Sequence, residues 1–259
     1  MKTSALRRFS LMLLCCGLLV LGSACSSTAK SRAAEAQPPR RVLFIGNSYT
    51  FYNGGVPAAL NWLSKGSLDC TPCVSGGKSL AWHYTQGEAL KVLRSERWND
   101  VVLQDYSLEA LDKPELMALF IRRFDQEIDA IGARTVLYQT WPRKNAPQNG
   151  PQIYKAYEDS AAETRAKLAA VGRAFVEAQK KRPGLELYNA DNSHPSPAGT
   201  YLAACVFYAT LLDRSPVGLE SYVIDEIGKP VITLKPEQAR FLQGIANSIA
   251  RPAPVVQTE

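Results

Sequence analysis

Short apolar runs alternate with segments of helical spacing along most of this chain of 259 residues. Four such pairs follow one another: residues 42–45 then 56–64, 68–74 then 88–94, 101–104 then 114–131, and 135–139 then 153–167. Regular alternation of strands with helices is typical of βαβ units, whose parallel strands form a sheet with helices on both faces. The sequence therefore predicts a three-layer α/β/α domain around a parallel sheet.

The same pattern continues toward the C-terminus. A brief strand-like run at 168–171 precedes helical spacing at 173–181, and further helices are expected at 197–212 and 236–250. Residues 214–235, rich in turn-formers and β-branched residues, predict a surface excursion. We place one domain at 41–250 and expect residues 251–259 to form a disordered tail.

The first 25 residues have the pattern of a signal peptide. Basic residues precede an apolar run over 11–21, and small residues lead to Cys25. This ending resembles a bacterial lipobox, which implies a lipid anchor on Cys25, whereas cleavage at a neighbouring site would leave a simply exported protein. Residues 26–40 read as a flexible tether. Export to the periplasm or cell envelope is expected, with membrane contact only through the anchor.

The net charge of +6 belongs to the leader and tether. Eight of the 30 basic and two of the 24 acidic residues lie outside residues 42–250, which leaves 22 of each inside. A neutral domain gives no basic stripe, so no nucleic-acid partner is expected.

Three cysteines remain after the leader. Cys70 and Cys73 have the spacing of a redox pair, and three alternatives stay open for them: a disulfide, two buried free thiols, or redox or metal chemistry. Cys205 lies in an apolar helical run and is predicted to pack in the core.

Polar residues that can do chemistry follow the predicted strands. The first strand ends in Gly46-Asn47-Ser48, and α/β sheets keep their ligand sites at the carboxyl ends of their strands. Far downstream, Asp191 precedes His194 by three residues. A histidine can accept and return a proton near neutral pH, and a nearby carboxylate can hold its ring in one tautomer. These residues predict a hydrolytic triad of Ser48, His194 and Asp191.

Four separated blocks extend this reading: 46–48, 76–79, 104–107 and 191–194. Their order resembles that of the SGNH hydrolases, also called GDSL-type esterases, over residues 41–213. The resemblance implies a flavodoxin-like parallel sheet of about five strands. It also implies Ser48 as nucleophile, His194 as general base and Asp191 as the acid that orients it.

The resemblance further implies an oxyanion hole built from backbone N–H groups. Ser48 supplies one, and Gly77 or its neighbour Gly76 supplies the second, since a glycine lets backbone approach the substrate closely. The third block lacks the family's asparagine; Gln104 carries the same amide on a longer arm and is the expected third donor, with Ser107 as the fallback.

Other side chains are candidates for contact with substrate. Asn47 stands beside the nucleophile in place of the family's commoner aspartate, and Ser107 lies in the third block. His83 either lines the cleft or is a satisfied buried histidine, and Trp141 either stacks on a sugar ring or packs in the core. Lys78 and Arg143 read as solvated surface residues.

These observations predict a serine esterase that needs no metal or cofactor. Its expected substrate is a small-molecule or carbohydrate ester, and an acetylated sugar is the substrate we favour. Two alternatives use the same fold: a lipid-tethered glycan-binding protein with weak or no turnover, and an acyltransferase with the same triad. The oligomeric state is not encoded in any pattern found here.

Overall fold

The computed structural model describes residues 38–86 and 88–251, and within them five parallel strands form one sheet in the order β2–β1–β3–β4–β5. The strands are β1 (Arg40–Gly46), β2 (Leu68–Val74), β3 (Asp100–Leu103), β4 (Arg134–Tyr138) and β5 (Lys167–Ala169). This flavodoxin-like order confirms the predicted fold class. The strand order reverses between β1 and β3, and ligands of open α/β sheets bind at the carboxyl ends of strands beside such a reversal.

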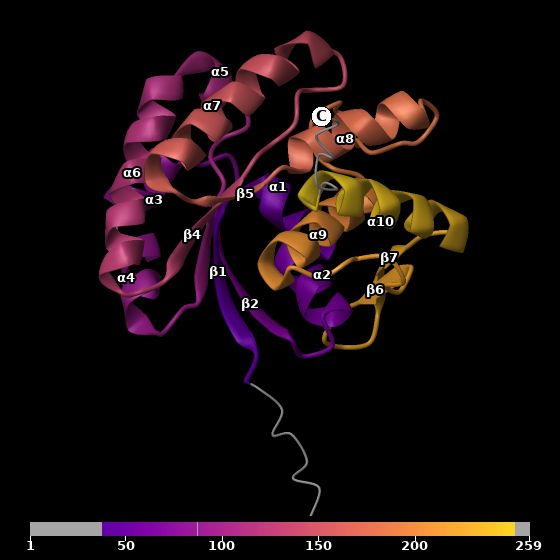
Figure 1. The fold of residues 1–259 in the computed structure, drawn as a ribbon, viewed down its shortest axis with the longest axis horizontal. Coiled ribbons are helices and arrows are strands. Elements are labelled where there is room, and N and C mark those ends of the chain that lie inside the picture. The colour runs from indigo at the N-terminus through magenta and orange to yellow at the C-terminus, as the bar shows by residue number, and fades with distance from the viewer. Residues whose placement is uncertain (1–37, 87, 252–259) are drawn as a thin grey trace, which may run out of the picture. The chain divides into compact units, whose positions relative to one another are not determined.

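Helices cover both faces of the sheet (Figure 1). One face carries α2 (Val56–Leu63), α8 (Val171–Lys181), α9 (Pro197–Leu212) and α10 (Pro236–Ala250); the other carries α3 (Leu80–Thr85), α4 (Glu88–Ser95), α6 (Pro114–Ala130) and α7 (Gly150–Thr164). Alternate side chains of β1 enter the two cores, with Val42 and Phe44 on the first side and Leu43 and Ile45 on the second. Burial on both faces explains why the central strands are apolar throughout.

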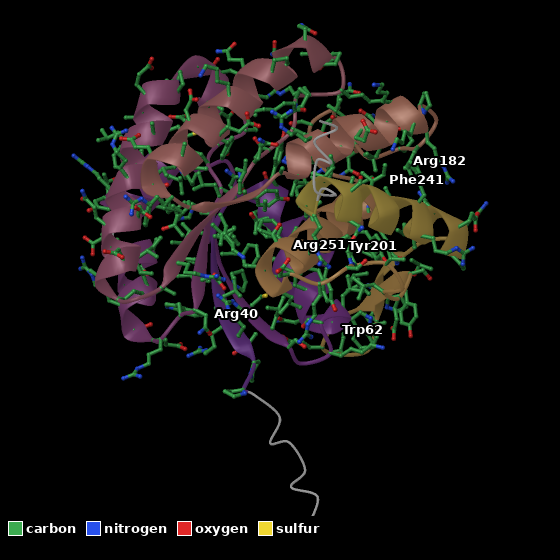
Figure 2. The ribbon with its side chains drawn as sticks, viewed as in Figure 1. Arg40, Trp62, Arg182, Tyr201, Phe241 and Arg251 are labelled. Atoms are coloured by element: carbon green, nitrogen blue, oxygen red, sulfur yellow. The ribbon has the colours of Figure 1, made fainter. Side chains whose placement is uncertain are left out.

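Helix α9 is the centre of its layer. Twelve of its sixteen residues are buried and none is charged, which is the composition of a helix enclosed on all sides. Cys205 is among the buried residues, which confirms its predicted place in the core. Helix α10 closes the layer over α8 and α9, where the Arg182 guanidinium lies 4.0 Å from the centre of the Phe241 ring (Figure 2).

Strand β2 forms one edge of the sheet, and its two cysteines are free. Side chains three residues apart on a strand point to opposite faces, so Cys70 packs in the α9 core while Cys73 packs on the α3 side. The disulfide alternative is therefore wrong. The side-chain amide of Asn61 binds the edge at Cys70, accepting from its N–H at 2.7 Å and donating to its carbonyl at 3.1 Å. This contact covers part of the open edge.

The start of β1 differs from the predicted domain boundary by one residue. Arg40, expected to end the tether, is the first residue of β1 and pairs with Asp100, whose side chain is fully buried. Arg134 pairs with the same carboxylate at 2.8 Å. Two guanidinium groups therefore neutralise a buried charge at the amino edge of the sheet.

Two other predictions differ in detail. The helix expected over 153–167 ends at Thr164, because Arg165 takes a left-handed conformation (φ 56°) that turns the chain into β5. Within 214–235 the chain forms an antiparallel hairpin of β6 (Tyr222–Ile224) and β7 (Pro230–Thr233). The hairpin is held to the domain because Val223 and Ile232 are buried in the α9 core.

No helix within residues 38–86 and 88–251 combines the length and apolar character needed to cross a bilayer. The predicted signal peptide, Cys25 and residues 26–37 of the tether lie outside the described residues, as do residues 252–259 of the predicted tail.

Candidate active site

Ser48 is presented at the carboxyl end of β1 by a tight strand-to-helix turn. β1 ends at Gly46, Asn47 caps the short helix α1 (Ser48–Phe51), and its side chain accepts a hydrogen bond from the Tyr49 N–H. A Cβ at Gly46 would lie 2.7 Å from the side chains of both Gln104 and Thr50. Glycine is therefore required at the point where the turn packs against β3.

His194 is carried by a tight loop before α9. The Asn189 N–H donates to the His194 carbonyl at 2.8 Å, Tyr188 and Pro195 form a β-bridge, and Asn192 has a positive φ of 59°. Asn53, which follows α1, donates to the Pro195 carbonyl at 2.8 Å. These contacts hold the histidine loop against the segment that carries Ser48.

The three predicted triad residues lie in one hydrogen-bonded chain. His194 Nε2 is 2.8 Å from Ser48 Oγ, and His194 Nδ1 is hydrogen-bonded to Asp191 Oδ2. The other carboxylate oxygen of Asp191 accepts from the backbone N–H groups of Ser193 at 3.0 Å and His194 at 2.9 Å. The bond from His194, with these backbone donors, lowers the pKa of Asp191 to about 2. An ionised Asp191 favours the tautomer with a proton on Nδ1, which leaves Nε2 free to accept the Ser48 proton.

Aromatic rings that the sequence reasoning missed hold the histidine in place. Tyr52 stacks on the His194 ring with 4.1 Å between centroids, and Tyr49 meets it edge-on at 5.6 Å. The Tyr49 hydroxyl lies 2.7 Å from Ser193 Oγ in the histidine loop. Their signal in the sequence is their place one and four residues after Ser48: Tyr49 lies on α1, and Tyr52 directly follows that helix.

A cavity of about 200 Å³ opens beside the Ser48 hydroxyl. It is lined by Asn47, Ser48, Tyr49, Gly77, Tyr106, Ser107, Arg143, Ser193 and His194. Gly77 has a φ of +67°, a conformation that glycine adopts at little cost, and its place in the lining favours it over Gly76 as a backbone donor. Two members of the third block, Tyr106 and Ser107, also line the cavity, and Ser107 is the one that the sequence offered as an alternative donor.

Gln104 is not available as an oxyanion donor, so this prediction is corrected. Its side chain is fully buried, and its amide nitrogen donates to Asn47 Oδ1 at 2.9 Å and to the Asp105 carbonyl. Its amide oxygen accepts from the Asn47 N–H and the Thr50 hydroxyl, both at 2.9 Å. With both N–H groups engaged, Gln104 positions the turn that carries Ser48.

Trp141 and His83 are both buried and pack in the protein interior, so their prediction as substrate-binding residues is corrected. The Trp141 ring is buried between Tyr49 and Phe175, with centroids 4.6 and 4.0 Å away, and its Nε1–H donates to the Ser193 carbonyl at 3.0 Å. His83 is buried with Nε2 2.8 Å from the Gly46 carbonyl, and burial lowers its pKa. Both side chains support the active-site turns from behind.

Asn47 lines the cavity, but its side-chain amide is already hydrogen-bonded within the protein, donating to the Lys78 and Asp105 carbonyls.

Asp105, in the third block, is hydrogen-bonded to the start of α3, which follows the second block. Its Oδ1 accepts from the backbone N–H groups of Leu80 at 2.9 Å and Tyr106 at 2.7 Å. Burial raises the pKa of Asp105 from 3.8 to about 7, against these two hydrogen bonds. The carboxyl group is therefore held in its protonated form over most of the acidic range.

This shift predicts a pH-dependent stability that Asp105→Asn removes. Because the folded pKa exceeds the unfolded one, the contribution of Asp105 is complete below about pH 4 and is lost as pH rises to about 7. A separation of about three pKa units corresponds to roughly 4 kcal/mol. Urea unfolding between pH 4 and pH 9 should show wild type losing more stability than Asp105→Asn. The exposed Asp159→Asn is the control, and equal pH slopes for all three proteins would contradict the assignment.

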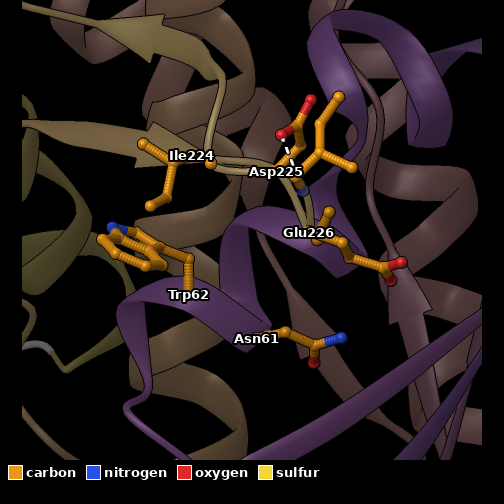
Figure 3. A pocket seen from close by; sticks show the side chains of 8 residues that line it. Asn61, Trp62, Ile224, Asp225 and Glu226 are labelled. Atoms are coloured by element: carbon orange, nitrogen blue, oxygen red, sulfur yellow. Dashed lines mark hydrogen bonds between the residues drawn. The ribbon is translucent and has the colours of Figure 1, made fainter.

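A second, larger cavity of about 790 Å³ lies between α2 and the β6–β7 hairpin (Figure 3). Trp62 and Asn61 line it from α2, and the hairpin contributes Ile224 to Gly228. The Asn61 amide is already occupied by Cys70, and the Asp225 carboxylate accepts from the Ile227 N–H at 3.1 Å. Its lining includes neither Ser48 nor His194, both of which line the smaller cavity.

Within the described ranges, no group of three or more His, Cys, Asp or Glu side chains is arranged to hold a metal ion.

Solved structures with the same fold were found by structural comparison. A protein from Slackia heliotrinireducens, assigned to the SGNH hydrolases, is 32% identical, with a TM-score of 0.58 over 67% of this chain and 99% of its own. A DUF4886 family protein from Bacteroides uniformis is 21% identical, with a TM-score of 0.57 over 83% of this chain and 96% of its own. An acetylxylan esterase from Geobacillus stearothermophilus is 16% identical, with a TM-score of 0.52 over 66% and 94%.

The last two structures, at such low identity, show the common fold alone. No protein-family model matches the sequence, and no curated protein sequence matches it either. The Slackia protein, by contrast, aligns over nearly its whole length at an identity that establishes common family membership. By this relationship, the chain belongs to the SGNH hydrolase superfamily.

Proposed function

We propose that the protein is a serine esterase whose nucleophile is Ser48. The observation that carries the proposal is the chain of hydrogen bonds from Ser48 Oγ through His194 to Asp191. A hydroxyl whose proton can pass to an oriented imidazole is an activated nucleophile. Membership of a hydrolase family supports the same reading.

The proposed reaction follows the geometry. His194 Nε2 takes the proton as Ser48 Oγ attacks the ester carbonyl, and Asp191 stabilises the imidazolium that forms. The alcohol leaves with that proton, and a water molecule, deprotonated by His194, then cleaves the acyl-serine and releases the acid. The backbone N–H groups of Ser48 and Gly77 bind the tetrahedral oxyanion, and the Ser107 hydroxyl is the third donor in place of Gln104.

We propose a short-chain ester of a carbohydrate as the substrate. The cavity of about 200 Å³ suits a small acyl group such as acetyl. The acetylxylan esterase that shares this fold acts on an acetylated sugar polymer, which makes the same substrate class the first to test. Trp141, buried in the core, gives this proposal no support.

Covalent labelling by a fluorophosphonate tests the enzyme proposal, because only an activated serine reacts. We expect stoichiometric label on Ser48 and release of acetate from acetylated sugars, with longer acyl chains turned over more slowly. A protein that binds glycan but takes no label would instead be a catalytically inactive binding protein. Transfer of the acyl group to an added sugar alcohol, read by mass spectrometry, would identify an acyltransferase.

We further propose that the protein is exported and held at the cell envelope by a lipid on Cys25. The supporting features are the basic flank, the apolar run and the small residues before that cysteine. Mass spectrometry of the mature N-terminus should find a lipidated Cys25, and Cys25→Ala should move the protein to the soluble fraction. An unmodified N-terminus at another residue would contradict the anchor.

A further inference from the structure

Arg143 brings a permanent positive charge to the wall of the Ser48 cavity. The other side chains of the lining are uncharged, apart from His194 when it carries the proton. The sequence predicts Arg143 at the solvated surface, and its place in the cavity lining corrects this prediction. A cation beside a nucleophile requires an explanation, because the reaction at Ser48 is complete without it.

The Arg143 guanidinium has no carboxylate partner within salt-bridge distance among residues 38–86 and 88–251, unlike its neighbour Lys144, which pairs with Glu186 at 2.7 Å. Its Nε is shielded from solvent and has no hydrogen-bond partner in this part of the chain. Leaving a buried donor of a charged group unpaired is costly. The positive charge also acts on Tyr49, whose pKa burial raises and Arg143 lowers.

The segment around Arg143 is fixed to the histidine loop by its neighbours. The Trp141 Nε1–H donates to the Ser193 carbonyl at 3.0 Å, the Tyr188 hydroxyl donates to the Pro142 carbonyl at 2.9 Å, and the Lys144 N–H donates to the Asn192 carbonyl at 2.8 Å. Residues on both sides of Arg143 are thus tied to the loop that carries the catalytic base. The backbone that carries Arg143 is therefore fixed relative to the catalytic base, and its side chain lines the cavity, which is the placement a specificity residue needs.

We infer that the ester cleaved at Ser48 carries a carboxylate close to the scissile bond, and that Arg143 binds this carboxylate. This inference rests on the proposed esterase function. A guanidinium is the side chain best matched to a carboxylate, with which it forms two parallel hydrogen bonds. A single cation in a small cavity balances a single negative charge; the nearby Lys78 ammonium lies over the Trp82 ring instead. The substrate class is an acidic ester, such as an O-acyl group on a sugar acid.

Two pairs of isosteric esters test this inference and locate the carboxylate. In the first pair, para-acetoxybenzoate carries the carboxylate on the alcohol side of the ester, and para-acetoxybenzamide is its neutral counterpart. In the second pair, the para-nitrophenyl ester of glutarate carries the carboxylate on the acyl side, and the same ester of the glutarate half-amide is its neutral counterpart. Arg143→Gln should lower kcat/KM for the charged member of one pair by about ten- to a hundredfold, mainly through KM, and leave the neutral member within about twofold. Arg143→Lys should retain part of the preference. Lys144→Gln removes a charge outside the cavity and should change neither pair.

The ratio of charged to neutral rates is measured within one preparation, so it does not depend on how much of a variant folds. Equal losses on both members of each pair, or no loss on any, would overturn the inference. If wild type hydrolysed the charged and neutral esters of each pair equally well, the inference about Arg143 would be overturned, while the esterase proposal would stand. Should no ester be cleaved, calorimetric binding of para-hydroxybenzoate decides: it should weaken at least tenfold in Arg143→Gln, and unchanged binding refutes the role of Arg143.

Discussion

Replacing Ser48 with alanine should reduce ester hydrolysis by about four to six orders of magnitude, because the attacking oxygen is removed while the rest of the site stays in place. The change leaves α1 intact, since Asn47 supplies the cap of that helix. Hydrolysis of para-nitrophenyl acetate and labelling by a fluorophosphonate should both fall to background. The thermal unfolding midpoint should stay within a few degrees of wild type.

Ser95→Ala is the matched control for this variant. Ser95 ends α4, and its exposed hydroxyl bonds only to the Val92 carbonyl within its own helix. This variant should keep full activity and full labelling. If Ser48→Ala retained more than about a hundredth of the wild-type rate, or if the label moved to another serine, Ser48 would not be the nucleophile.

The second large effect is expected from Gly172→Ala, which should lower the free energy of unfolding by about 4 kcal/mol. Gly172 lies in the first turn of α8, and a Cβ there would be 1.9 Å from the Thr140 carbonyl oxygen and 2.8 Å from the carbonyl carbon. Alanine favours a helix by up to about 1 kcal/mol over glycine. Forcing a backbone segment away by more than 1 Å should cost several times that amount, about 4 kcal/mol. The clash therefore outweighs the helix propensity, and chemical denaturation should show the loss.

Gly244→Ala makes the same chemical change where it is harmless. Gly244 lies within α10, and a Cβ there would meet nothing within 4 Å. This variant should be more stable than wild type by about 0.5–1 kcal/mol. Similar stability changes at the two glycines would show that the close approach of α8 to the end of β4 is not as described.

The strands and the contact between Ser48 and His194 could be predicted from the sequence for the same reason. Uniform apolar runs mark strands buried on both faces, and parallel strands bring their carboxyl ends, with the residues that follow, to one edge. Ser48 and His194 are 146 residues apart and still meet at that edge, where the family resemblance placed them.

The role of Gln104 could not be predicted in this way. A polar residue at the end of a strand points to the cleft or back into the fold according to the register, and a shift of one residue reverses its direction. β3 pairs with β1 so that Leu103 lies opposite Ile45, which places Gln104 against Gly46 and Asn47. Nothing in either segment alone reveals this pairing.

Trp141 and Arg143 illustrate a second limit. Their positions depend on contacts between segments distant in sequence: the bond from Trp141 to Ser193 spans 52 residues, and the Trp141 ring also stacks between Tyr49 and Phe175. From the sequence, Trp141 could stack on a sugar ring or pack in the core, and Arg143 is expected at the solvated surface. Only the packing of Tyr49, Phe175 and Ser193 against the Trp141 ring shows that this tryptophan is enclosed. The arginine two residues later lines the cavity beside Ser48.

Strand β1 runs the full height of the sheet, from Arg40 at one edge to Gly46, two residues before Ser48, at the other. The six steps between these ends, at a rise of about 3.3 Å each, separate them by roughly 20 Å. A bead or electrode coupled ahead of Arg40 would therefore join the domain at the edge opposite Ser48. Coupling at this edge should leave the Ser48 hydroxyl accessible even to polymeric esters, so the proposed esterase could be immobilised there for repeated use.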